Sequence, residues 1–244
     1  MNELKRQRFF RYDFSQHQIN KKIIKRYWGV RGLGESVRYL LAYLNVDYKH
    51  QAYYNPQDWF AKDKAQLKIE FSNLPYLIDG EQKITDSYAI SIYIIRKYHR
   101  EDLLGYSEDG SYNEREVKIA QLIGVTRDIF QQIVHICFSP QFDKIKDQAF
   151  EKGQIFLNQL TDFLGDKQFL LGHLSLADFL FYEALTYYQV LHSQSITQRH
   201  EEYMHQFESL PGIKQYLNYA SKNFNSFLLN LKQQQQQQQQ KISL

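Results

Sequence analysis

The first residues that could do chemistry are two aromatic side chains next to a group of glycines. Tyr27 and Trp28 end a short stretch that suits a strand, and Gly29, Gly32 and Gly34 follow shortly after them. A tyrosine hydroxyl at the end of a strand can donate a hydrogen bond to an anion in a cleft, although two aromatic residues at such a place can equally belong to the core. The glycine order G-x-x-G-x-G is not the dinucleotide-binding fingerprint. It predicts a strand-to-helix turn that brings the backbone close to a ligand.

A proline and the start of a helix supply two further candidate sites. In Asn73-Leu74-Pro75, the proline suits a sheet edge or a turn because it cannot donate a ladder hydrogen bond. If the Leu74–Pro75 bond is cis, Leu74 turns its backbone N–H and C=O outward, where an extended peptide can pair with them. Asp86 and Ser87 open a later helix. A hydroxyl and free N–H groups at that position form either an anion site or an ordinary cap.

The sequence gives little support for a metal site, a reactive thiol or a nucleotide site. The eight histidines show no metal-ligand spacing, so we expect no metal site. Cys137 is the single cysteine and lies on an apolar helix face, which predicts a buried, inert thiol in a reducing compartment. The sequence has no P-loop Gly-Lys-Ser/Thr. Ser175-Leu-Ala-Asp178 has the spacing of a helix capping box and predicts a structural role.

Composition and charge narrow the class of protein. The chain has 244 residues, of which 43% are hydrophobic and 23% are charged, enough for a packed core. It contains no run of about 18 apolar residues, so we expect no membrane span, and no secretory signal is visible. The net charge of +3 is too small to indicate a nucleic-acid partner. Residues 1–26 carry eight Lys or Arg against two acidic residues. This basic arm is typical of a solvated terminus, while a tether to an acidic surface or an organelle-targeting peptide stays open.

Hydrophobic periodicity divides the chain into an α/β half and a helical half. Val37, Leu40, Leu41 and Leu44 fall at i, i+3, i+4 and i+7, one face of a helix, and Gly80-Glu81 predicts a tight hairpin. The first half is expected to run β-α-β-α-β-β-α, with strands over 22–28, 46–52, 74–79 and 82–85 and with later helices over 59–67 and 87–98. Ser87 is the expected cap of the last of these. The second half lacks strand signals and predicts helices over 113–138, 142–164, 176–192 and 213–231.

These elements imply two domains and two terminal extensions. We expect a flexible basic extension over 1–22, an α/β domain over 23–104, a polar linker over 105–112, an all-α domain over 113–231 and a tail over 232–244. The tail contains eight consecutive glutamines, a composition typical of disorder.

Four stretches in both halves resemble the cytosolic glutathione transferases. They cover residues 26–38, 71–80, 83–90 and 128–142, and the run Asn-Leu-Pro-Tyr-Leu-Ile-Asp-Gly at 73–80 is most similar to the mu class. The short segment before Trp59 is similar to the sigma class. The resemblance implies a thioredoxin-like domain with a cis Pro75, followed by an all-helical domain. It also implies a cytoplasmic homodimer that detoxifies hydrophobic electrophiles, with glutathione as cosubstrate and with no other cofactor.

The same resemblance assigns roles to individual residues. Tyr27 would stabilise the thiolate of glutathione with a hydrogen bond from its hydroxyl. Glutathione would be held by Trp28, Trp59, Lys64, Asn73, Leu74, Pro75, Asp86 and Ser87, together with Asp128 of the partner subunit. The electrophile pocket would be walled by Val30, Leu33, Val134 and Phe138. Phe71 would be the aromatic residue that locks the dimer.

Three positions depart from the mu-class pattern. Pro56 stands where an arginine that grips the glycine carboxylate is expected, and Asp86 stands where glutamine is usual. Phe138 replaces a tyrosine that assists reactions at the electrophile, which argues against epoxide-type chemistry. Other functions stay open: a sigma-type glutathione-dependent isomerase or peroxidase, a non-enzymatic binding protein with the same fold, and a nucleic-acid binder acting through the basic arm.

Overall fold

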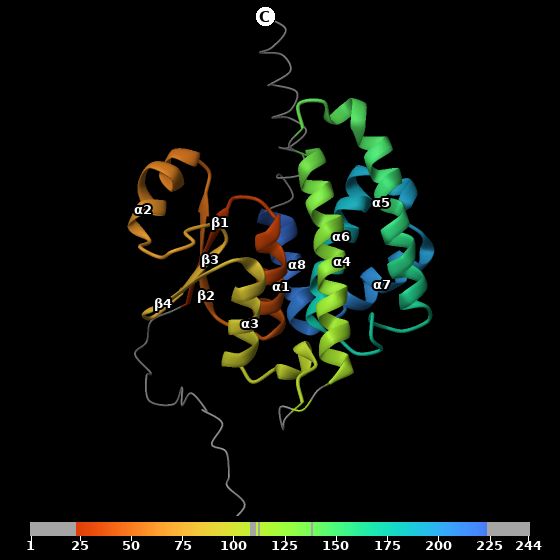
Figure 1. Cartoon of the computed structure of the whole chain (residues 1–244), viewed down its shortest axis with the longest axis horizontal. Helices are drawn as coiled ribbons and strands as arrows, with labels where there is room; N and C mark the ends of the chain where they lie inside the picture. Colours follow the sequence, from red (N-terminus) through yellow and green to blue (C-terminus); the bar gives the residue numbers. More distant parts are fainter. Residues whose placement is uncertain (1–22, 108–110, 112, 138, 224–244) are drawn as a thin grey trace, which may run out of the picture.

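The computed structural model describes residues 23–107, 111, 113–137 and 139–223, and these form a four-stranded sheet with helices packed around it (Figure 1). The predicted basic extension, Phe138 and the predicted tail lie outside the described residues, and the linker is described only in part. Among the helices of the described ranges, none is long and apolar enough to cross a membrane.

The sheet has the strand order β2-β1-β3-β4. β1 (Ile23–Trp28) pairs in parallel with β2 (Tyr48–Tyr53), and helix α1 (Leu33–Tyr43) provides the crossover that a parallel pair needs. β3 (Tyr76–Asp79) and β4 (Gln82–Thr85) form the predicted hairpin, in which Gly80 has the positive φ, 61°, of a tight turn. β1 is therefore a central strand that delivers Tyr27 and Trp28 at its C-terminal end.

Helices cover both faces of the sheet. A π-helical segment, Asp58–Asp63, and α2 (Lys64–Gln66) lie on one side, whereas α1 and α3 (Ser87–Lys97) lie on the other (Figure 1). The apolar residues that predicted α1 also explain its position, because Val37, Leu40 and Leu41 are fully buried. The Leu74–Pro75 bond is cis, as predicted. The thioredoxin-like arrangement expected from the sequence is confirmed.

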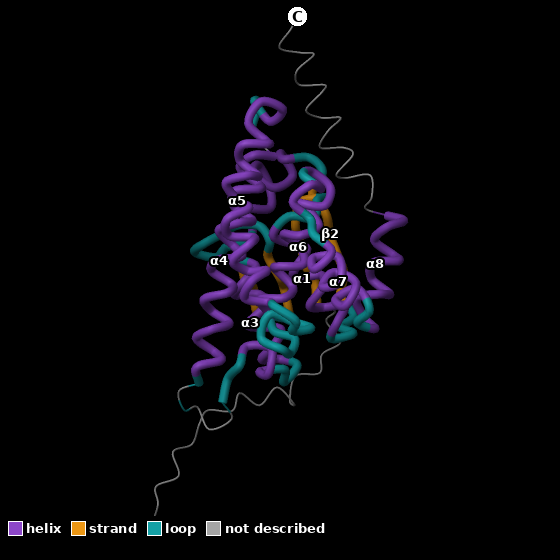
Figure 2. The backbone as a smooth tube through the Cα atoms, turned by 90° about the vertical axis from the view of Figure 1, so that its right-hand side faces the viewer, coloured by secondary structure: helices purple, strands orange, loops and turns teal. Residues whose placement is uncertain are grey.

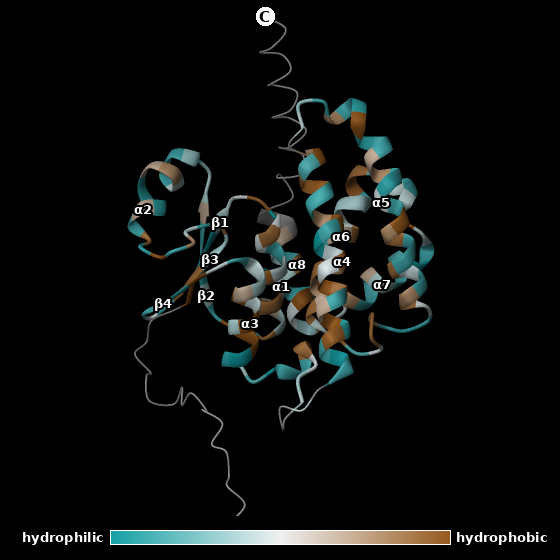
Figure 3. Cartoon of the chain, viewed as in Figure 1, coloured by the Kyte–Doolittle hydropathy of each residue, from teal (hydrophilic) through white to brown (hydrophobic). Residues whose placement is uncertain are grey.

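The second half of the described chain is helical. It consists of α4 (Glu114–Cys137), α5 (Phe142–Leu164), α6 (Leu176–Leu191), α7 (Gln198–Glu208) and α8 (Pro211–Asn223), with short 3-10 helices at Glu101–Leu104 and Ser193–Ser195. In Figure 2, α1 and α6 lie between α4 and α8, and α6 packs against both α1 and α4. Hydrophobic residues form stripes along these helices (Figure 3). One continuous core therefore joins the sheet half to the helical half.

The predicted capping box of α6 is confirmed and has a structural role. The Asp178 carboxylate accepts hydrogen bonds from the backbone N–H and the hydroxyl of Ser175, both at 2.8 Å. It also accepts from the Leu170 N–H at 2.9 Å and from the Tyr203 hydroxyl at 3.0 Å. A buried carboxylate is tolerated at this place because its oxygens are fully used by donors.

Two predictions about helix ends were wrong. Ser87 does not cap α3: it is the first residue of the helix, and Asp86 is the cap. The Asp86 carboxylate accepts from the backbone N–H groups of Tyr88 and Ala89 at 2.9 and 3.0 Å, and its charge suits the positive end of the helix dipole. The helix predicted over 213–231 begins at Pro211, and a further helix, α7, precedes it.

Candidate functional site

The Tyr27 ring packs against the turn that leads from β1 into α1. Its side chain is 7% exposed, and its hydroxyl accepts a hydrogen bond from the Leu33 N–H at 3.2 Å. A β-carbon at Gly32 would lie 2.6 Å from the Tyr27 hydroxyl, and one at Gly34 would lie 2.5 Å from the ring. The strand-to-helix turn predicted from the glycines is present, and the two glycines are explained by its close approach to Tyr27; the predicted approach to a ligand stays a prediction.

The environment of Tyr27 keeps its hydroxyl protonated. Burial raises the pKa of the Tyr27 phenol above its ordinary value. A neutral phenol can donate its proton in a hydrogen bond while its oxygen accepts from the Leu33 N–H. The hydroxyl can therefore act as a polarised donor toward an anion at this place.

Helix α6 of the helical half holds the β1–α1 turn. Arg31 forms an ion pair with the buried Glu183, with Nη2 2.6 Å from Oε2, and also contacts the Tyr39 hydroxyl. The Gly32 N–H donates to the Tyr187 hydroxyl at 3.2 Å. Contacts from both halves of the chain therefore fix the position of the turn. They also fix the Leu33 N–H that donates to Tyr27.

The cis-proline segment borders the same region from the sheet side. Leu74 is almost completely buried, and its backbone N–H donates to the Asn73 side-chain oxygen at 2.9 Å. An extended peptide that pairs with Leu74 would have to compete with this Asn73 carboxamide for the N–H. Pro75 fixes the direction in which the Leu74 backbone enters β3.

The predicted residues near α2 differ in exposure. Trp59 is 2% exposed and stacks on Tyr76, with ring centroids 5.7 Å apart, so its ring belongs to the core under α2. Trp28 is half-buried and lies 6.0 Å from the Phe60 ring. The exposed Lys64 places its Nζ 5.7 Å from the same ring. Trp28 and Lys64 are therefore accessible to a ligand on this side, and Trp28 packs against the small core that contains Trp59.

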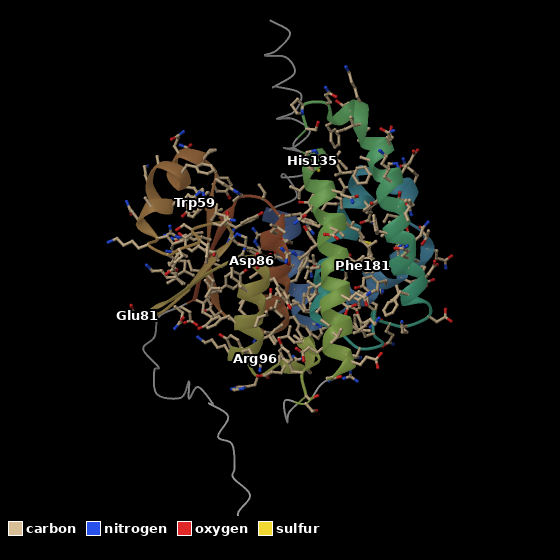
Figure 4. All side chains as sticks on the ribbon, viewed as in Figure 1. Trp59, Glu81, Asp86, Arg96, His135 and Phe181 are labelled. Carbon is tan, nitrogen blue, oxygen red and sulfur yellow. The ribbon has the colours of Figure 1, made fainter. Side chains whose placement is uncertain are left out.

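The start of α3 faces α4 across a small cavity. Asp86 is exposed, whereas Ser87 lines this cavity together with Leu33, Ser36 and Arg127. Asp128, next in the chain to Arg127, is exposed on α4. Figure 4 shows Asp86 at the start of α3, Trp59 on the α2 side of the sheet and His135 near the upper end of α4. The structure thus brings Ser87 beside the turn that contacts Tyr27.

A larger cleft opens next to Leu33. It has a volume of about 510 Å³ and is lined by Leu33, Phe130, Gln131, Val134, His135, Ser139 and Pro140. Leu33 and Val134 were predicted as walls of the electrophile pocket, and both line the cleft. Val30 instead packs beside Tyr27 and Trp59 in the smaller core of the sheet half. Phe138, the fourth predicted wall residue, lies outside the described residues.

Sequence reasoning missed most of this cleft. Phe130 and Val134 are four residues apart on α4, and so are Gln131 and His135. This spacing gave a signal that the four residues share one side of the helix. The spacing alone does not indicate that this side faces Leu33, because the contact joins residues about a hundred positions apart. The family resemblance placed Leu33 and Val134 in one pocket but gave no role to Phe130, Gln131 or His135.

Two further predicted residues lie away from the cleft. Phe71 is 82% exposed, in the segment between α2 and β3. Cys137 is buried, as predicted, and burial raises the pKa of its thiol to about 12, so the thiol stays protonated and unreactive.

Comparisons with known proteins agree over both halves. Residues 25–96 match the family model described as Glutathione S-transferase, N-terminal domain, and residues 127–220 match Glutathione S-transferase, C-terminal domain. The chain is 32% identical to Glutathione S-transferase Mu 1 of Homo sapiens over 205 residues, which cover 80% of this chain and 90% of the relative. It is 33% identical to Glutathione S-transferase class-mu 26 kDa isozyme 51 of Fasciola hepatica, with 84% of this chain and 91% of the relative covered. Among solved structures, the crystal structure of the glutathione S-transferase Blo t 8 has a TM-score of 0.70 and 28% identity, and covers 82% of this chain and 94% of its own.

Proposed function

The chain belongs to the glutathione S-transferase family, and on that premise we propose that it joins the thiolate of glutathione to hydrophobic electrophiles, with Tyr27 stabilising the thiolate. The observation that carries this proposal is the Tyr27 hydroxyl, protonated by burial and bonded to the Leu33 N–H beside a cleft of about 510 Å³. A sulfur placed at the hydroxyl would face an electrophile held in that cleft.

Tyr27 would act by changing the ionisation of the glutathione thiol. A free thiol has a pKa of about 8.5, so only about 3% of it is thiolate at pH 7. A hydrogen bond that lowers this pKa by about two units makes most of it thiolate and corresponds to about 2.7 kcal/mol. A charge-assisted hydrogen bond from a neutral phenol, together with nearby backbone dipoles, can supply a stabilisation of that size.

The remaining predicted residues would hold the peptide arms of glutathione. The backbone of Leu74, shaped by Asn73 and Pro75, would pair with the cysteinyl unit. The exposed Asp86 carboxylate suits the γ-glutamyl ammonium, and Ser87 suits its carboxylate. Trp28 and Lys64, supported by Trp59, would hold the glycyl end. No cofactor besides the cosubstrate glutathione is needed for this reaction.

We further propose that the protein acts as a homodimer in the cytoplasm. The 82% exposed Phe71 is an apolar ring with no cover in one subunit, which supports its role as the dimer lock. Asp128 of the partner subunit would then reach the γ-glutamyl group. The single, buried Cys137 suits a reducing compartment.

The deciding experiment is conjugation of chlorodinitrobenzene by the wild type and by Tyr27→Phe. We expect the rate at pH 7 to fall about 25-fold in the variant, because the thiol returns to its free pKa of about 8.5. The difference in rate between the wild type and Tyr27→Phe should become smaller above pH 9, because even an unassisted thiol is ionised there. Tyr98→Phe, which removes a hydroxyl near the end of α3, is the matched control and should leave the rate unchanged.

Two outcomes would contradict the proposal. Equal activity of the wild type and Tyr27→Phe would remove Tyr27 from the mechanism. A folded wild type that binds glutathione and conjugates nothing would favour the sigma-type isomerase or peroxidase, or the non-enzymatic binding protein.

A further inference from the structure

The part of the chain that carries Lys64 is held to the sheet by few side chains. This α2 segment, residues 58–66, consists of the π-helical turn and α2, and Figure 1 shows it on the side of the sheet away from the helical half. Trp59 is the one buried side chain within it. A segment that buries so little apolar surface moves relative to the sheet unless other contacts fix it.

Asp63 attaches the α2 segment to the sheet at a second point. Its Oδ2 lies 2.5 Å from Nη1 of Arg26 on β1 and accepts a hydrogen bond from the Tyr53 hydroxyl on β2, also at 2.5 Å. Trp59 and Asp63 are four residues apart, about one helical turn, and both contact residues of the sheet. An aromatic ring and an ion pair therefore fix the α2 segment together.

Arg26 is itself held in one orientation by residues of the sheet. Its Nε donates to the Gln51 side-chain oxygen at 2.6 Å, and its Nη1 donates to the Tyr53 hydroxyl at 3.0 Å. The Tyr53 hydroxyl also lies 2.9 Å from the Tyr76 hydroxyl. Burial and the hydrogen bond to Asp63 raise the pKa of Tyr53, so its hydroxyl keeps the proton that it donates to the carboxylate. The planar guanidinium thus presents a fixed donor to Asp63.

The other ion pair of the α2 segment does not reach the sheet. Lys62 Nζ lies 2.8 Å from Asp58 Oδ1, and the two side chains are 66% and 47% exposed. A pair formed within one segment cannot fix the position of that segment relative to the sheet. Among the contacts of the described residues, those of Asp63 are the one polar side-chain link between the α2 segment and the sheet.

We propose that Arg26, acting through Asp63, positions the α2 segment for the glycyl end of glutathione, and that this ion pair makes the protein select glutathione over γ-glutamylcysteine. The proposal rests on the proposed function, which places the glycyl carboxylate at Lys64. Lys64 follows Asp63 directly in the chain and begins α2, so a carboxylate held at a fixed point of the sheet also fixes Lys64. γ-Glutamylcysteine has the same thiol and the same γ-glutamyl group but no glycine, and its binding does not depend on the α2 segment. Arg26 is a positioning residue, because it acts on the ligand only through Asp63 and Lys64.

The test measures the binding of both thiol peptides in the absence of an electrophile. Trp28 and Trp59 are the two tryptophans of the chain, and both lie on the α2 side of the candidate site, so their fluorescence reports binding there. Titrations with glutathione and with γ-glutamylcysteine use the full-length wild type, Arg26→Met, Arg26→Lys and Asp63→Asn. The matched control is Asp58→Asn, which makes the same substitution in the same segment at a carboxylate that does not reach the sheet. Conjugation of chlorodinitrobenzene with each peptide then gives kcat and KM.

We expect the dissociation constant for glutathione to rise about 10-fold in Arg26→Met and in Asp63→Asn, as when one hydrogen bond to a charged group is lost. The dissociation constant for γ-glutamylcysteine and the kcat with either peptide should stay within about twofold of the wild type, because only ground-state binding of the glycyl end changes. Arg26→Lys keeps a cation beside Asp63 and should recover part of the affinity for glutathione. Asp58→Asn should change neither dissociation constant. A general loss of stability would instead weaken the binding of both peptides alike.

Three results would overturn the proposal. One is an unchanged affinity for glutathione in both Arg26→Met and Asp63→Asn, and another is an equal loss of affinity for the two peptides in these variants. The third is a wild type that binds both peptides equally well. Failure of the proposed function would look different: a wild type that binds glutathione but conjugates no electrophile would contradict that function, while the binding titrations would still decide the role of Arg26.

Discussion

Lys25 is a buried lysine whose amine has no hydrogen-bond partner among the described residues. It lies on β1 with its Nζ 5.4 Å from the centre of the Tyr27 ring, and its side chain is fully buried. Burial lowers the pKa of Lys25 well below its usual value, and the nearby Arg38 lowers it further, while Glu35 opposes both. The folded chain therefore holds this proton less tightly than the unfolded chain does, and the burial of Lys25 costs stability.

We predict that Lys25→Met raises the free energy of unfolding by about 1–3 kcal/mol at pH 7, since a buried unsatisfied polar group is removed. The unfolded state binds more protons than the folded state between the depressed pKa and the ordinary value of about 10.4, so wild-type stability should rise with pH toward that value. The variant should lack this rise. Urea unfolding at pH 7 and pH 9 measures both effects.

The control for this change is Lys49→Met, which removes an exposed lysine from the neighbouring strand β2. Its unfolding free energy should match that of the wild type within about 0.5 kcal/mol at both pH values. A Lys25→Met protein less stable than the wild type would mean that the amine has a stabilising role.

The prediction of elements from sequence succeeded where the apolar pattern was local and clear. α1 was predicted from four aliphatic residues. α7 was missed although its buried residues, His200, Tyr203, Met204 and Phe207, keep the same i, i+3, i+4, i+7 spacing. Two of these four residues carry polar atoms, and the segment around them is rich in Glu, Gln and His. The periodicity was present, but hydrophobicity alone did not reveal it.

The candidate site could be predicted to the extent that it is built from continuous motifs. Tyr27, Asn73 to Pro75, Asp86 and Ser87 lie in such motifs, and the predicted cis bond is confirmed. The polar residues of the cleft on α4 could not be predicted, because His135 faces Leu33 only once α4 has packed against the sheet half. Such a contact depends on loop lengths and helix packing, which a local pattern does not encode.

The β1–α1 turn and α6 should behave as one unit. Arg31 and Glu183 join them by an ion pair at 2.6 Å, and Glu183 is almost completely buried. Glu183→Met alone leaves the partly buried Arg31 with only the more distant Glu35 carboxylate, 3.9 Å away, and should cost about 1–3 kcal/mol of stability. Arg31→Met alone should also destabilise the protein. The double variant should lose less unfolding free energy than the two single variants lose together.

A double-mutant cycle on unfolding free energy and on chlorodinitrobenzene conjugation measures this coupling. We expect an interaction energy of about 1–3 kcal/mol. Activity should fall in each single variant, because the turn carries the Leu33 N–H that meets Tyr27. Strictly additive losses would show that the ion pair does not couple the two halves.

At the scale of the whole molecule, the proposed homodimer would add a residue of the partner subunit to the candidate site. The sheet half supplies Tyr27, Leu74 and Ser87, and the helical half supplies the cleft wall on α4. The proposed contact from Asp128 of the partner subunit would close the γ-glutamyl end. Assembly and glutathione binding should therefore be linked, since a ligand that binds only the dimer stabilises it.

Phe71→Ser tests this link. A buried aromatic anchor at an interface is commonly worth about 2 kcal/mol or more, so the dimer dissociation constant should rise about 30-fold. Sedimentation velocity over a dilution series measures the dissociation. The KM for glutathione should rise on dilution of the variant in step with the monomer fraction, because each monomer loses the partner's carboxylate.

The control variant is Tyr54→Ser, which removes an equally exposed aromatic residue, 81% exposed against 82% for Phe71. It should leave both the dissociation constant and the KM unchanged. A Phe71→Ser protein that sediments as the wild type does would remove Phe71 from the interface, and a KM for glutathione independent of dilution would separate assembly from binding.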